Sequence, residues 1–319
     1  MRFLFRFFST AFVFFLFVAH ASATPVNVVA TIKPLHSLTA AVMDGAGEPH
    51  LLLQGNASPH GYALRPSDIA AIDRADLIVW IGPDLETFLL KSMDAVTDKG
   101  KRVLTVEDLE GINKLDFRSL SREEDDDHAA HKGKDEHAAH DDHDHAHDGV
   151  DPHLWLDIDN AKAIVNAVRD VLSERDPENA ALYRSNAERT VKRLDSLNDV
   201  LKQKLGTVAA IPFVSFHDAY QYVEKAYGLS GIGSLAISPD RSPGAGHLRD
   251  VRALIKDRNV ACVFQEPQFP TRTAETVIDG TGARLGILDP LGNDIADGPD
   301  LYFTLMNDLG DSLRRCLVP

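Results

Sequence analysis

The stretch SDIAAIDRADLIVWIGPDLETFLLKSM, residues 67–93, contains the structural unit that recurs through most of this chain. A short apolar run at 77–81 lies between two amphipathic patterns of helical spacing, at 66–75 and 85–96. Apolar runs of this length, bounded by helical patterns, predict strands of a parallel sheet that helices cover on both faces. The pattern therefore predicts an α/β fold.

The same alternation occurs in both halves of the chain. In the first half we predict strands at 26–30, 51–53, 77–81 and 102–106, with helices at 36–44, 66–75 and 85–96. In the second half we predict strands at 212–216, 230–236, 260–265 and 283–288, with helices at 218–227, 247–258, 271–279 and 303–315. Two blocks of this kind predict two lobes, each a parallel β-sheet flanked by helices.

A polar helical tract separates the two blocks. Apolar residues recur at helical spacing through 159–175 and 177–205, with Pro177 in a first-turn position and Gly206 at the end. A helix over 177–205 would be about 43 Å long. We predict that it forms a rigid rod between the lobes; two ordinary helices of the second lobe are the alternative. The predicted division is a leader at 1–23, a first lobe at 24–158, a helical region at 159–206 and a second lobe at 207–319.

The N-terminal residues have the pattern of a signal peptide. Arg2 and Arg6 precede an apolar run of 13 residues at 7–19, and the small residues 21–23 form a cleavage pattern. The apolar run is too short for a permanent membrane-spanning helix, which argues against the alternative of an N-terminal anchor. We therefore expect an exported, soluble protein that begins near residue 24.

The chain is acidic, and one segment carries much of its charge. The formal net charge is −15, and residues 122–148 contain 11 acidic residues, 3 basic residues and 7 histidines. An acidic chain is a poor partner for nucleic acid or for anionic membrane surfaces, but it is suited to cations. The segment has too few apolar residues to fold by itself, so we predict a mobile, acidic, His-rich loop at 121–149.

The histidines of this loop predict weak, multiple metal sites, because imidazoles among carboxylates chelate borderline metals such as zinc. A solvated charged surface and a pH-sensitive spacer are the alternative interpretations. The residues concerned are His128, His131, His137, His140, His143, His145 and His147.

Cys262 and Cys316 are the two cysteines of the chain. In an oxidising compartment a single pair most simply forms a disulfide. Two separate buried thiols, or two metal ligands, are the alternatives, although neither cysteine has a histidine or a second cysteine at ligand spacing.

Four other residues are candidates for a tighter metal site. His60 lies in a turn-rich loop after the second predicted strand, whereas His217 and Asp289 directly follow later strands. His153 follows the His-rich loop. Ligands of open parallel sheets bind outside the carboxyl ends of the strands. Each residue alone also has a structural explanation, since a histidine can be a hydrogen-bonded loop residue and Asp289 can cap a turn before Pro290.

Four short motifs carry a family resemblance. They are Ser58-Pro59-His60-Gly61-Tyr62, followed by Leu64-Arg65-Pro66-Ser67-Asp68; His153-Leu154-Trp155-Leu156-Asp157; Phe216-His217-Asp218-Ala219-Tyr220; and Leu288-Asp289-Pro290-Leu291-Gly292. In this order, and over essentially the whole mature chain, they resemble the cluster A-I solute-binding proteins, the receptors of bacterial ABC importers for zinc and manganese. The His-rich loop, the cysteine pair and a histidine at 217 resemble the ZnuA type, which binds zinc.

The resemblance implies a metal site between the lobes, with His60, His153 and His217 as ligands. Asp289 is the expected fourth ligand and a water molecule is the alternative; some relatives have a Glu before the first histidine, where this chain has Pro59. Three imidazoles suit Zn2+ better than Mn2+. The resemblance also implies a periplasmic monomer that delivers zinc to an ABC permease and its cytoplasmic ATPase. An accessory periplasmic zinc protein is a further candidate partner.

Three other functions are considered. A manganese receptor of the same family is the nearest, and a periplasmic zinc buffer is the second. The third is a zinc-dependent hydrolase with Glu266 as general base, but the chain has neither an HExxH nor a GxSxG motif. We therefore predict a binding protein rather than an enzyme.

Overall fold

The computed structural model describes residues 26–318, except for 119–148, 237–238 and 240–241. The predicted signal peptide and all seven histidines of the His-rich loop lie outside the described residues. In the part of the chain that is described, no helix is long and apolar enough to cross a membrane.

Two four-stranded sheets form the centres of two lobes, and all neighbouring strands are parallel. The strand order is β2-β1-β3-β4 in the first sheet and β6-β5-β7-β8 in the second. Their bounds are β1 Val28–Ala30, β2 His50–Leu51, β3 Leu77–Trp80, β4 Arg102–Thr105, β5 Pro212–Ser215, β6 Ser230–Ser234, β7 Cys262–Gln265 and β8 Arg284–Ile287. The central strands β1, β3 and β7 are buried at every residue, as expected of sheets covered on both faces.

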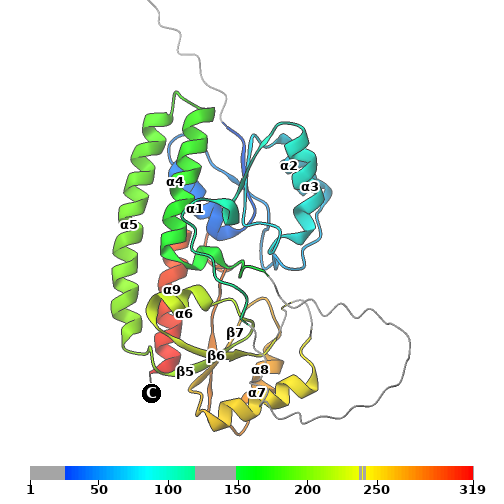
Figure 1. Cartoon of the computed structure of the whole chain (residues 1–319), viewed down its shortest axis with the longest axis vertical. Coiled ribbons are helices and arrows are strands. Elements are labelled where there is room, and N and C mark those ends of the chain that lie inside the picture. Colours follow the sequence, from blue (N-terminus) through cyan, green and yellow to red (C-terminus); the bar gives the residue numbers. More distant parts are fainter. Residues whose placement is uncertain (1–25, 119–148, 237–238, 240–241, 319) are drawn as a thin grey trace, which may run out of the picture.

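Helices cover these sheets (Figure 1). In the first lobe they are α1 (Lys33–Met43), α2 (Pro66–Arg74) and α3 (Leu90–Asp98), and in the second α6 (Gln221–Tyr227), α7 (Ala245–Asp257) and α8 (Arg272–Ile278). Three short 3-10 helices, η1 (Thr87–Leu89), η2 (Val106–Asp108) and η3 (Leu154–Leu156), lie in the first half of the described chain. The prediction of two α/β lobes with parallel sheets is confirmed.

The lobes are joined along one side by long helices. In Figure 1, α4 (Ile158–Arg175) and α5 (Ala180–Gly206) lie side by side, and α5 extends from the first lobe to the second. With 27 residues, α5 is about 40 Å long. It begins three residues later than the pattern predicts, because Asp176 and Asn179 form a turn that includes Pro177.

The C-terminal helix α9 (Leu301–Leu317) is a second connection between the lobes. Near its start, the Tyr302 amide donates to Ser37 Oγ of α1, and near its end Cys316 forms a disulfide with Cys262 of β7. One hydrophobic core runs from the first sheet along α4, α5 and α9 into the second sheet, whereas a smaller core lies beneath α7 and α8. The packing between the lobes is therefore continuous.

Candidate metal centre

His60 reaches the site from the loop between β2 and α2. Its backbone amide donates to Ser58 Oγ at 3.3 Å, and its side chain is partly buried. The loop is held at its far end by Asp68, whose Oδ2 accepts from Tyr62 Oη and from the Arg65 amide, both at 2.8 Å. Burial, followed by the nearby His153 and His217, holds the pKa of His60 well below 6.5. The ring is therefore neutral and can bind a metal.

His153 lies one residue before η3 and is 3% exposed. The segment that carries it pairs with the chain before the His-rich loop, through an isolated antiparallel bridge between Asp116 and Val150. The Nδ1 of His153 lies 2.6 Å from Oδ1 of Asp151, and Asp151 is fully buried. Because a carboxylate accepts hydrogen bonds, a neutral His153 donates from Nδ1 and keeps the lone pair of Nε2 for a metal.

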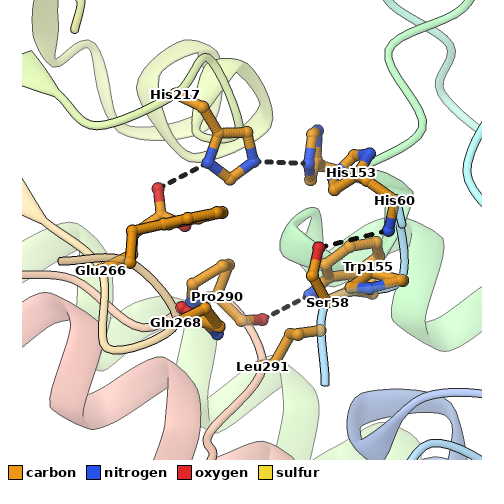
Figure 2. Close-up of a pocket in the computed structure, with 11 residues that line it drawn as sticks. Ser58, His60, His153, Trp155, His217, Glu266, Gln268, Pro290 and Leu291 are labelled. Atoms are coloured by element: carbon orange, nitrogen blue, oxygen red, sulfur yellow. Dashed lines mark hydrogen bonds and ion pairs between the residues drawn. The ribbon is translucent and has the colours of Figure 1, made fainter. Parts of the chain in front are cut away.

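His217 directly follows β5 and has the same kind of support. Its Nδ1 lies 2.6 Å from Oε1 of Glu266, which follows the neighbouring strand β7 and is 1% exposed. Burial disfavours the charged imidazole, but the negative charge of Glu266 and its hydrogen bond outweigh that cost and raise the pKa of His217 above 6.5. Figure 2 shows His217 between Glu266 and His153.

The three imidazoles converge on one point. One ring nitrogen from each of His60, His153 and His217 lies within 4.8 Å of the others, and the Nε2 atoms of His153 and His217 are 3.2 Å apart. In a tetrahedral zinc site with Zn–N bonds of about 2.0–2.1 Å, ligand nitrogens are about 3.3–3.4 Å apart. Two lone pairs that face each other at such a distance are stabilised by a shared cation. The donor set therefore fits Zn2+.

The space between the rings is small. The cavity has a volume of about 10 Å³, and its wall includes Pro59, Trp155, Phe269, Pro290 and Leu291. That is about the space of one water molecule, so the cavity suits an ion and not an organic substrate.

The expected fourth ligand is not part of this group. The described residues contain one group of at least three potential ligands with this spacing, and it lacks Asp289. The carboxylate of Asp289 accepts from the amides of Leu291, Gly292 and Asn293, at 2.6–3.0 Å. Asp289 therefore caps the turn that follows β8, which is the structural explanation considered above.

The roles of Asp151 and Glu266 were not predicted from the sequence. Two signals were available: Asp151 is two residues from His153, and Glu266 follows β7, which is the neighbour of β5 in the sheet. The carboxyl ends of adjacent parallel strands lie at the same edge, so Glu266 and His217 must be close. The hydrogen bond to His217 makes Glu266 a support for a proposed ligand, a role different from that of the general base in the hydrolase alternative.

Comparison with known proteins identifies the family. The family model for the periplasmic zinc-uptake complex component A, ZnuA, matches residues 28–316. The chain belongs to the ZnuA family. A relative from Brucella abortus, named high-affinity zinc uptake system protein ZnuA, is 42% identical over 306 residues, which cover 91% of each chain. The family consists of solute-binding receptors for zinc transport and not of enzymes.

Solved structures show the same fold. The periplasmic zinc-binding protein TroA from Treponema pallidum has a TM-score of 0.76 and 22% identity, and the match covers 93% of this chain and 100% of TroA. FpvC from Pseudomonas aeruginosa, solved in complex with Mn2+, has a TM-score of 0.75 and 21% identity, and the match covers 92% and 99% of the two chains. TroA is named for zinc and FpvC was solved with Mn2+, so the fold alone does not distinguish the two metals.

Proposed function

We propose that this ZnuA-family chain is a high-affinity periplasmic receptor that binds one Zn2+ through His60, His153 and His217. The convergence of three ring nitrogens within 4.8 Å carries the proposal. Asp151 and Glu266 support it further, because carboxylates that hold the far nitrogens of two histidines are typical of zinc sites in proteins.

The donor atoms favour zinc over the manganese alternative. Three neutral imidazoles suit Zn2+, whereas Mn2+ prefers sites that are richer in carboxylate and water. In this chain Asp151 and Glu266 contact the imidazoles, and although Glu266 also lines the cavity, the converging ligand atoms among the described residues are three histidine nitrogens. We propose that a water molecule takes the fourth position, because the carboxylate of Asp289 is engaged by the amides of its own turn.

We further propose that the chain, as a periplasmic monomer released from its signal peptide, delivers zinc to an ABC permease and its ATPase. Family membership supports this role. The histidines at 128–147 would supply additional weak sites. The division into lobes at 24–158 and 207–319, with a helical region at 159–206, is part of the same proposal.

The test is a competition titration of the mature protein with a zinc chelator. We expect one tight zinc site that survives deletion of 122–148, and that is lost in His153→Ala. Excess Mn2+ should not displace the zinc. A tight site that persists in His60→Ala, His153→Ala and His217→Ala would contradict the assignment, and preferential occupancy by manganese would favour the manganese receptor.

A further inference from the structure

Asp151 connects a proposed ligand to the opposite lobe. Its Oδ1 accepts from the Nδ1 of His153 at 2.6 Å and from the His153 amide at 3.0 Å. Its Oδ2 accepts from Nε2 of Gln221, the first residue of α6, at 3.0 Å. Gln221 lies four residues after His217, so one short segment carries one ligand and also contacts the carboxylate that holds another.

The backbone of Asp151 is fixed in the same way. Its carbonyl oxygen accepts from the hydroxyl of Tyr222 in α6 at 2.8 Å, and its amide donates to the Leu115 carbonyl at 2.7 Å. The Tyr222 hydroxyl also accepts from the Leu115 amide at 3.1 Å. Asp151 is fully buried in this arrangement, so loss of the Gln221 amide removes the hydrogen bond that its Oδ2 accepts in the interior. The unpaired carboxylate oxygen would then draw Asp151 into a new orientation.

In the described part of the chain, the side chains that hold His217 and His60 make no hydrogen bond of this kind to the opposite lobe. His217 is held by Glu266, which belongs to the same lobe. For His60, the contact to the Ser58 side chain stays within its own loop. The position of α6 therefore affects the ring of His153 through a chain of two hydrogen bonds.

We propose that Gln221 is a positioning residue through which the second lobe sets the residence time of zinc on His153. The inference rests on the proposed function. Gln221 holds Asp151, Asp151 holds the Nδ1–H of His153, and the Nε2 of His153 thereby stays directed at the metal. A displacement of α6, as on docking to a transporter, breaks the first of these bonds and weakens the hold of His153 on zinc without moving the histidine backbone.

The experiment measures zinc dissociation into excess chelator by stopped flow for the full mature chain and for Gln221→Leu. The variant keeps a side chain of similar size but loses the donor. We expect the dissociation rate to rise about tenfold, which is the effect of losing one hydrogen bond to a charged group, while the association rate stays the same. Gln265→Leu is the matched control, because Gln265 is 7% exposed against 8% for Gln221, and it should keep the wild-type rate.

A second readout needs no zinc. In the metal-free protein, nitrogen NMR should find His153 in the Nδ1–H form, and Gln221→Leu should shift it toward a mixture of the two tautomers. A purely structural role of Gln221 would leave this spectrum unchanged. Asp151→Asn is the second variant should Gln221→Leu fail to fold, and it should weaken zinc binding about 10- to 100-fold.

The outcomes separate this inference from the proposed function. If zinc binding depends on His153 but the folded Gln221 or Asp151 variant keeps the wild-type dissociation rate and tautomer, the inference is overturned and the receptor function stands. If zinc binding by the wild type does not depend on His153, the proposed site itself fails.

Discussion

The metal centre has two sides, with His153 and His217 on one and His60 on the other, and the two sides differ in how their histidines are held. His153 and His217 are 3% and 5% exposed, and each contacts a buried carboxylate at 2.6 Å. His60 is partly buried on a loop, and its backbone amide donates a hydrogen bond to Ser58 Oγ. His153 and His217 are therefore preorganised by carboxylates, whereas His60 depends on its loop; Figure 2 shows the contact of His217 with Glu266.

Substitution of a single ligand should have the largest effect on zinc binding, and it tests whether His217 and His60 are held differently. We expect His217→Ala and His60→Ala each to weaken zinc binding by about 3 kcal/mol, on the order of 100-fold, if the binding energy is shared among four ligands. Their metal-free proteins should differ. His217→Ala leaves Glu266 buried without this partner and should lower the free energy of unfolding by about 1–3 kcal/mol, whereas His60→Ala should change it by less than about 0.5 kcal/mol.

Chelator competition measures the affinities, and urea unfolding without zinc measures the stabilities. An equal loss of stability in both variants would show that His60 is as firmly built into the metal-free protein as His217, and the contrast between the two sides would be wrong.

Substitution of Glu266, whose carboxylate contacts His217, should have the next largest effect on zinc affinity. Glu266→Gln keeps the shape of the side chain but removes the charge that fixes the imidazole. We expect zinc affinity to fall about 10- to 100-fold, the usual range for a partner of a metal-binding histidine. Isothermal titration with a competing chelator measures the loss, and Gln265→Glu serves as a control that adds a carboxylate at the neighbouring position, the last residue of β7. An unchanged zinc affinity in Glu266→Gln would show that this carboxylate does not contribute to zinc binding, and the contrast drawn between His217 and His60 would be wrong.

As the pH falls, the ring of His217 should take up a proton before the ring of His60 does. The raised pKa of His217 means that its ring takes a proton at higher pH than His60, whose pKa is lowered. Zinc requires neutral rings, so affinity should decrease as the pH falls through the raised pKa of His217, by about tenfold per pH unit for each competing proton. In Glu266→Gln this decrease should begin at lower pH, because the neighbouring charge that raises the pKa is gone.

The stability of the metal-free protein should show the opposite pH dependence for the same group. A pKa raised in the folded state means that protonated His217 stabilises the native protein below the unfolded value of about 6.5, and that this contribution is lost as the pH rises through the folded pKa. Urea unfolding of metal-free wild type and Glu266→Gln between pH 5 and pH 8 measures it. If the wild-type and variant curves are parallel, His217 and Glu266 are not coupled.

Substitution of Asp289 should have the smallest effect on zinc affinity. We expect Asp289→Asn to change zinc affinity by less than about threefold, below the contribution of one ligand, and to lower stability by about 1 kcal/mol through the lost turn contacts. The same titration and unfolding assays measure both quantities. A hundredfold loss of affinity would instead identify Asp289 as a ligand that replaces the proposed water molecule.

The sequence by itself determined the fold class and most of the element positions, because parallel strands and covering helices follow from the local period of apolar residues. It also singled out His60, His153 and His217, since each lies in a motif or at a strand end that can be read along the chain. Export and the His-rich loop remain predictions from composition, because their residues lie outside the part that the structure describes.

Only the tertiary structure decided what surrounds these histidines. A strand-end Asp that caps a turn and one that binds a metal have the same local pattern, so the position of Asp289 among the amides of its own turn could not be deduced. The contact of Gln221 with Asp151 joins residues 70 positions apart. Such distances depend on how the two sheets and α6 pack against each other, and packing of remote segments leaves no periodic signal in the sequence.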